Sequence, residues 1–197
     1  MKIVLFGDSI TDMGRDRDAD LCASSYGYGY PNAIAFQLVK SNPIKYEIYN
    51  RGVSGDRIVD LYARIKRDVL NVSPDVLSIL IGINDVWHDL FENPNGVDVV
   101  RFEKIYRMII EETKERLPNI KIVLCEPFVL IGSATKEKYE SFLAIKNYAK
   151  VVNKLAREYD LYFLPLQKVL DDAAKRFGSV RIRFYMTECI RLSQVRG

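Results

Sequence analysis

The chain reads KIVLFGDSIT at residues 2–11, and its architecture can be worked out from this segment. Residues 2–6 form a short run of β-branched, aliphatic and aromatic side chains, which is typical of a buried strand. Gly7 then allows a sharp turn, and Ser9 follows just beyond the carboxyl end of that strand. Ligands bind at the carboxyl ends of strands in open α/β sheets, so Ser9 is a candidate nucleophile. A helix cap is the alternative interpretation, because Ser and Asp are preferred at helix N-termini.

The remainder of the chain alternates between strand and helix patterns. Strands that alternate with helices form a parallel sheet with helices on both faces. We therefore predict a three-layer α/β/α fold with a five-stranded parallel sheet of the flavodoxin-like kind, in strand order 2-1-3-4-5. After the first strand, further strands are predicted at residues 46–49, 75–81, 121–125 and 162–164, and helices at 31–39, 58–69, 99–117, 136–159 and 169–177.

The bulk composition is that of one ordinary globular domain. The 197 residues are 48% hydrophobic and 28% charged, and no apolar run approaches the length of a membrane span. Three scattered cysteines, Cys22, Cys125 and Cys189, argue against a disulfide framework or a zinc site. With no signal peptide before the first strand, we expect a cytoplasmic protein without a membrane partner.

The net charge of +3 is concentrated at one end of the chain. Residues 179–197 hold four arginines and one glutamate, so they carry the whole charge of +3. The net charge of residues 1–178 is therefore zero. A nucleic-acid-binding protein carries its basic residues as a patch or stripe on the folded domain. We therefore expect no nucleic-acid partner.

Three polar sites are expected to meet at one edge of the sheet. Ser9 follows the first strand, Gly52 lies in the turn RGVSGD after the second, and Asn84 follows the third. Acyl transfer needs a nucleophile and preorganised donors for the oxyanion that develops. The backbone N–H groups of Ser9 and Gly52 and the side-chain amide of Asn84 could supply those donors.

These segments resemble a known family. The motifs GDS at residues 7–9, RGVSGD at 51–56 and GIND at 82–85 resemble the first three sequence blocks of the SGNH hydrolases, also called GDSL esterases or lipases. The resemblance runs from residue 1 to about residue 178, and residues 7–12 and 81–87 are most similar to the acetylxylan-esterase-like branch, which removes acetyl groups from sugars.

The resemblance implies the SGNH hydrolase fold and a serine ester hydrolase that cleaves small acyl esters, with acetylated sugar as its substrate. It implies that Ser9 is the nucleophile and that Gly52 and Asn84 complete the oxyanion hole. Asp8, Trp87 and Tyr28 are expected to line the substrate, although aromatic residues beside a loop also serve simple packing. Neither a cofactor nor a metal is implied, and assembly into a homo-oligomer is left open.

The sequence departs from the family near its C-terminus. The fourth block of the family, Asp-x-x-His, supplies the general base and the aspartate that orients it. This chain has a single histidine, His88, four residues after Asn84, and no such block. His88 could act as a substitute base or could simply be solvated in its loop.

The tail has a second interpretation at the level of its codons. Residues 186–197 read MTECIRLSQVRG. A permitted coding of that stretch, read from one base earlier, translates as Tyr-Asp-Gly-Val-His-Pro-Thr-Val-Ala-Gly-Ala, which contains the missing block. We therefore interpret residues 1–178 as the hydrolase domain and 179–197 as a frameshifted tail that replaces the last catalytic block and the helix after it. Activity would then be impaired.

Two alternatives belong to other functional classes. Without a general base, the chain could be a catalytically silent binding protein of the same fold, or a truncated gene product. A flavodoxin-like cofactor binder would use the same sheet, but the acidic Asp8 and Asp12 are unsuited to a phosphate-binding loop.

Overall fold

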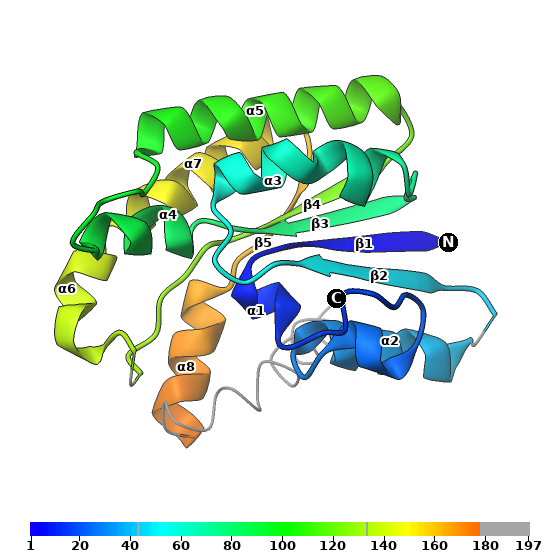
Figure 1. Ribbon diagram of the computed structural model, residues 1–197, viewed down its shortest axis with the longest axis horizontal. Helices are drawn as coiled ribbons and strands as arrows, with labels where there is room; N and C mark the ends of the chain where they lie inside the picture. The colour runs from blue at the N-terminus through cyan, green and yellow to red at the C-terminus, as the bar shows by residue number, and fades with distance from the viewer. Residues whose placement is uncertain (43, 133, 178–197) are drawn as a thin grey trace.

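A computed structural model describes residues 1–42, 44–132 and 134–177 of the chain (Figure 1). They form one parallel sheet in the order β2-β1-β3-β4-β5, which confirms the predicted fold class and strand order. The proposed tail, residues 179–197, lies outside the described residues. The strands are β1 (Lys2–Gly7), β2 (Glu47–Gly52), β3 (Val76–Leu80), β4 (Lys121–Cys125) and β5 (Tyr162–Leu164).

Helices cover both faces of the sheet (Figure 1). One face carries α3 (Ile58–Ile65), α5 (Val99–Arg116) and α7 (Ile145–Glu158), and the other carries α2 (Tyr30–Ser41) and α8 (Gln167–Phe177). Three short helices follow the strands or lie beside them: α1 (Ser9–Asp12), α4 (Ile83–Trp87) and α6 (Tyr139–Phe142). Single helical turns complete the set at Ala23–Tyr26, Lys66–Leu70, His88–Leu90 and Lys136–Lys138.

The strand β1 is buried on both of its faces, as its continuous apolar sequence predicts. Val4 and Phe6 pack in the core beneath α3, α5 and α7, whereas Ile3 and Leu5 pack in the core on the side of α2 and α8. Successive side chains of a strand point to opposite faces, so one short strand contributes to two cores. Among the described residues, no helix combines the length and the apolar character needed to cross a bilayer.

The predicted single helix at residues 136–159 is wrong. The chain instead forms the turn at 136–138, α6 and then α7, with a change of direction at residues 143–144. Phe142 explains the break, because its buried ring packs edge-on against Trp87 at 5.0 Å and draws α6 toward α4.

Candidate active site

The sheet register brings the predicted site segments together. Gly7 pairs with Gly52 of β2 on one side and with Leu80 of β3 on the other. The turns that follow these three strands therefore leave the sheet at the same edge. Asn84 lies in α4, directly after the third of these turns.

Ser9 is the first residue of α1, and Asp8 is the residue that caps the helix. The Asp8 carboxylate accepts a hydrogen bond from the Ile10 N–H at 2.9 Å. Ser9 is half-buried, and neither its N–H nor its hydroxyl has a hydrogen-bond partner among the described residues. The cap and the nucleophile candidate are thus two neighbouring residues, and capping does not occupy Ser9.

Asp8, which the sequence predicts to line the substrate, is buried in this structure. Only 1% of its surface is exposed, and its second carboxylate oxygen, Oδ2, has no hydrogen-bond partner. Burial raises the pKa of Asp8 to about 7, and the nearby charge of Asp56 adds to the shift. Burial likewise raises the pKa of Asp85 to about 7, with a further contribution from Asp8. The site therefore lies over a pair of poorly solvated carboxyl groups.

Gly52 packs α1 against β2, and its N–H is already bonded. The Gly52 N–H donates to the side-chain oxygen Oδ1 of Asn50 at 2.9 Å. A Cβ atom at Gly52 would lie 2.1 Å from the Asp12 nitrogen, so only glycine allows this approach of helix and strand. In this structure the predicted oxyanion donor is therefore not free.

Gly55, three residues later in the same motif, has the properties expected of that donor. Its φ of +91° belongs to the region that favours glycine, and a Cβ there would meet open space. Its N–H has no hydrogen-bond partner among the described residues. The motif RGVSGD contains two glycines, and no feature of the sequence pattern distinguishes the packed one from the open one.

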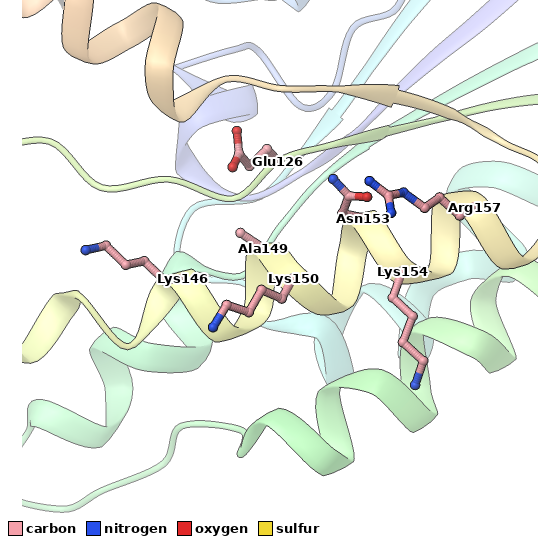
Figure 2. Close-up of a pocket in the computed structure, with 7 residues that line it drawn as sticks. All are labelled: Glu126, Lys146, Ala149, Lys150, Asn153, Lys154 and Arg157. Atoms are coloured by element: carbon pink, nitrogen blue, oxygen red, sulfur yellow. The ribbon is translucent and has the colours of Figure 1, made fainter.

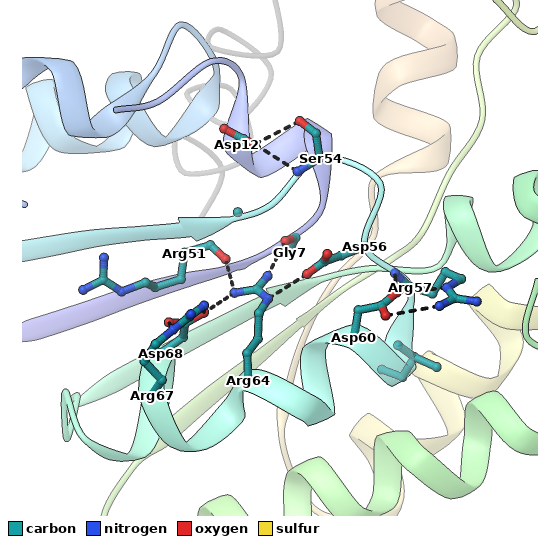
Figure 3. A network of polar contacts seen from close by, with 12 residues as sticks. Gly7, Asp12, Arg51, Ser54, Asp56, Arg57, Asp60, Arg64, Arg67 and Asp68 are labelled. Atoms are coloured by element: carbon teal, nitrogen blue, oxygen red, sulfur yellow. Dashed lines mark hydrogen bonds and ion pairs between the residues drawn. The ribbon is translucent and has the colours of Figure 1, made fainter. Parts of the chain in front are cut away.

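Asp12 fixes the turn that carries Gly55. One of its carboxylate oxygens accepts hydrogen bonds from both the N–H and the hydroxyl of Ser54, each at 2.9 Å (Figure 3). Arg17 forms an ion pair with the same oxygen. Burial alone would raise the pKa of Asp12, but the bonds from Arg17 and Ser54 outweigh it and lower the pKa. A charged Asp12 therefore joins the helix of Ser9 to the turn of Gly55.

Arg64 of α3 joins the ends of β1 and β2 from beneath (Figure 3). Its guanidinium donates to the carbonyl oxygen of Gly7 at 3.0 Å and to that of Arg51 at 2.9 Å. It also forms ion pairs with Asp56 at 2.6 Å and Asp68 at 2.5 Å, and its side chain is only 11% exposed. One side chain thus holds both strand ends and the turn of Asp56 in a single arrangement.

Asn84 faces the same turn from α4. One hydrogen of its side-chain amide is donated to the carbonyl oxygen of Asp56 at 3.0 Å, which leaves the second hydrogen available. The neighbouring Asp85 accepts the N–H of Ile58 at 3.0 Å, at the start of α3. Neither Arg64, Asp12 nor Asp85 was identified as a site residue from the sequence, since only the fold brings their partners near.

The other predicted residues lie around this arrangement. Trp87 is half-buried against Phe142, whereas Tyr28 is 81% exposed. The His88 ring packs at 5.1 Å from Phe91, and its pKa is lowered by burial and by the nearby charge of Arg57. No hydrogen bond joins His88 to Ser9 in the described part of the chain.

The polar groups of this edge do not form an evident metal site. In the described ranges, no group of three or more His, Cys, Asp or Glu side chains is arranged to hold a metal ion. What the arrangement provides is a half-exposed serine hydroxyl at the same edge of the sheet as the unbonded Gly55 N–H and the Asn84 amide. Such a set is suited to attack on a carbonyl carbon and to stabilisation of the oxyanion that results.

Comparison with known proteins agrees with this chemistry. The family model of the GDSL-like lipase/acylhydrolase family matches residues 5–180. An acetylxylan esterase from Geobacillus stearothermophilus is 34% identical over 180 residues, a match that covers 88% of this chain and 80% of that protein.

Solved structures of similar proteins share the fold. A protein described as a GDSL-like lipase from Parabacteroides merdae superposes with a TM-score of 0.86 at 37% identity, covering 95% of this chain and 92% of the other. An acetylxylan esterase structure from G. stearothermophilus superposes with a TM-score of 0.82 at 29% identity, covering 96% and 90%. Structures described as catalytic mutants of that esterase replace a serine, an aspartate or a histidine by alanine.

Proposed function

Since this chain belongs to the GDSL-like lipase/acylhydrolase family and its enzyme class is therefore that of an esterase, we propose that it removes acetyl groups from carbohydrate esters. The observation that carries the proposal is the position of Ser9, half-exposed at the start of α1 and unbonded among the described residues. The acetylxylan esterase relatives support acetylated carbohydrate as the substrate class.

In the proposed reaction the Ser9 hydroxyl gives its proton to a general base, and its oxygen attacks the carbonyl carbon of the acetyl ester. The ester C–O bond then breaks, the sugar hydroxyl leaves with that proton, and water hydrolyses the acetyl-serine to acetate and free Ser9. The developing oxyanion accepts hydrogen bonds from the N–H of Ser9, from the N–H of Gly55 and from the second amide hydrogen of Asn84. We assign Gly55 in place of Gly52, because the Gly52 N–H already binds Asn50. Removal of one such donor typically costs about 10²–10³ in kcat.

The general base is the missing part of this reaction. The chain has one histidine, His88, which makes no hydrogen bond to Ser9 in the described ranges. The related esterase has a catalytic histidine with a catalytic aspartate three positions before it, and one permitted coding of residues 186–197, read from one base earlier, contains the same spacing. We propose that this frame encodes the base and that the chain without it is slowed by roughly 10⁴–10⁶.

The test compares the chain with a version whose tail is recoded in the alternative frame. We expect a fluorophosphonate probe to label Ser9 in the recoded chain and to leave its Ser9→Ala variant unlabelled. The recoded chain should also release acetate from acetylated xylo-oligosaccharides. Absence of labelling in a folded, recoded chain would refute the assignment of Ser9 as nucleophile.

The second candidate function is that of a catalytically silent protein, and the absence of a general base for Ser9 favours it. It predicts that the chain and its Ser9→Ala variant hydrolyse p-nitrophenyl acetate equally slowly. A substitute role for His88 predicts instead that His88→Ala removes the residual turnover. Measured together, the two variants distinguish a silent protein from a weak esterase.

A further inference from the structure

A polar pocket of about 390 Å³ lies beside α7 (Figure 2). Glu126, the residue directly after β4, lines one side of it, and a face of α7 lines the other. None of the residues that line it belongs to the candidate active site. The α7 face consists of Lys146, Ala149, Lys150, Asn153, Lys154 and Arg157.

The spacing of these residues gives the pocket its shape. Positions three and four apart lie on one face of a helix, so the four cations follow one another along α7. From Lys146 to Arg157 the face extends about 16 Å at the helical rise. Ala149 has the shortest side chain of the set and lies in the middle of this face, where a longer side chain would fill the hollow.

Most of the positive charge on this face is unpaired. Lys154 points away from Glu126 in Figure 2, and its ammonium group binds Glu103 of α5 at 2.8 Å. In contrast, Lys146, Lys150 and Arg157 form no ion pair within the part of the chain that the structure describes.

Glu126, the acidic member of the pocket, is committed to another contact. Its carboxylate oxygen Oε2 accepts the N–H of Leu166 at 2.7 Å and the N–H of Gln167 at 2.9 Å, at the start of α8. It therefore does not neutralise the basic face of α7 through a direct ion pair. The lining residues carry four positive charges and one negative charge, and a concave site strengthens the field of such an excess.

This arrangement of charge is unfavourable for α7 by itself. Lys146 and Lys150 are like charges at the i,i+4 spacing, as are Lys150 and Lys154, and such pairs destabilise a helix. Acidic residues elsewhere in residues 1–178 balance this positive charge, because the net charge of residues 1–178 is zero. A basic stripe on the domain was not expected from the sequence, where the positive charge was assigned to the tail.

We propose that this pocket binds the carboxylate groups of uronic-acid residues in an acidic oligosaccharide, which anchors the chain whose acetyl esters reach Ser9. The inference rests on the proposed function for its carbohydrate. Asn153 and Arg157 lie next to one another on the α7 face in Figure 2, and the guanidinium of an arginine presents parallel donors to a planar carboxylate. Lys146 and Lys150 supply charges for a second carboxylate further along the helix.

The position in the fold fits a long substrate. Glu126 and Ser9 both follow the carboxyl ends of their strands, so the Glu126 end of the pocket shares one edge of the sheet with the nucleophile. The rest of the pocket follows α7 away from that edge, as far as Arg157. The strand β4 is the second neighbour of β1, which places their ends about 10 Å apart. An oligosaccharide of several units spans that separation.

The experiment measures binding by isothermal titration with this chain as it is. The ligands are an unacetylated xylo-oligosaccharide that carries glucuronic acid, a neutral xylo-oligosaccharide of equal length, and tripolyphosphate as a phosphate source. We expect the acidic sugar to bind at least tenfold more tightly than the neutral one and to weaken as salt is added. Lys150→Ala and Arg157→Ala should each weaken it about tenfold.

The control variant is Lys104→Ala, which removes an exposed lysine of the neighbouring helix α5 outside the pocket. It should leave binding unchanged, and unfolding midpoints should show that all three variants are folded. Equal affinity for acidic and neutral sugars, tighter binding of tripolyphosphate, or wild-type affinity in both pocket variants would overturn the proposal. Ser9 labelling of the recoded chain tests the esterase chemistry separately, so the two can fail independently.

Discussion

Asp8 and Ser9 are adjacent residues with opposite environments, and each environment has a measurable consequence. Burial raises the pKa of Asp8 from 3.8 to about 7, so the folded protein binds this proton more tightly than the unfolded chain. Stability from this group is therefore fully present below about pH 4 and is lost as the pH rises through 7. Asp85 titrates in the same range, so the two carboxyl groups act together.

We compare the free energy of unfolding of Asp8→Asn with that of the wild type at pH 5 and at pH 8. We predict that the variant gains about 3 kcal/mol relative to the wild type on going from pH 5 to pH 8. Asparagine cannot ionise, yet its side-chain oxygen can still cap α1 at Ile10. Urea unfolding at the two pH values measures the difference. The exposed Asp18→Asn serves as control and should show no such change. An unchanged pH slope in Asp8→Asn would show that Asp8 does not titrate in this range.

The two glycines of the RGVSGD motif should respond differently to alanine. Gly52→Ala forces a Cβ to within 2.1 Å of the Asp12 nitrogen, so we expect a loss of about 3 kcal/mol or more in unfolding free energy. Gly55→Ala meets open space and costs only the backbone strain of its positive φ, about 1 kcal/mol. Alanine at residue 55 keeps the backbone N–H but disfavours the positive φ that orients it, so Ser9 labelling in the recoded chain should slow at least tenfold.

A Gly55→Ala variant that labels Ser9 at the normal rate would show that the oxyanion hole does not depend on the positive φ of Gly55. A well-folded Gly52→Ala variant would contradict the packing role of Gly52. At the residue scale, the sequence motifs located Ser9 and Asn84 at one edge of the sheet, as predicted. They could not show that the Gly52 N–H is bonded to Asn50, because that contact depends on how β2 ends.

At the scale of elements, α3 joins the strand ends that support the site. Arg64 donates to the carbonyl oxygens of Gly7 and Arg51 and pairs with two aspartates beneath them. Its guanidinium also lies over the Phe6 ring at 4.5 Å, where a flat cation stacks favourably. The sequence predicted α3 from its apolar spacing, but nothing in that spacing distinguished Arg64 from the other charged residues of the helix.

We predict that Arg64→Met lowers the free energy of unfolding by about 3 kcal/mol, because it leaves Asp56 and Asp68 without their shared buried partner. Arg67→Ala is the matched control, since Arg67 also pairs with Asp68 but is 73% exposed. It should cost less than about 1 kcal/mol. Urea midpoints for the two variants provide the test, and equal losses would contradict the special role of Arg64.

The accuracy of the element predictions depended on how local their signals were. The strands β4 and β5 were predicted at their observed bounds, because each is a short apolar run with a clear start and end. The helix predicted at 136–159 was wrong, since the contact of Phe142 with Trp87 that breaks it joins residues 55 positions apart. The short helix α1 was missed because four residues give no periodic pattern.

At the scale of the whole molecule, the two faces of the sheet differ in the helices that cover them. Among the described residues, α3, α5 and α7 cover one face, whereas α2 and α8 cover the other (Figure 1). On the second face, α2 also exposes large apolar side chains, including Phe36 at 63% exposure. The layered fold was predictable from the alternation of strands and helices, but this difference between the faces was not.

We predict that recoding residues 179–197 in the alternative frame raises the urea midpoint, because the frame resembles the block and helix that complete the family fold. Removing those residues altogether should leave the midpoint close to that of the present chain. Both measurements are independent of activity. A recoded chain with an unchanged midpoint would argue against a helix in that frame.

The contacts of Arg64 carry a final consequence for heating. Because one guanidinium ties the backbone of β1 to that of β2, the groups around Ser9 cannot loosen while the centre of the sheet stays intact. Many enzymes lose activity on warming before they unfold, since their sites lie on the least stable segments. In this chain the geometry around the nucleophile should instead persist up to the cooperative melting of the sheet itself.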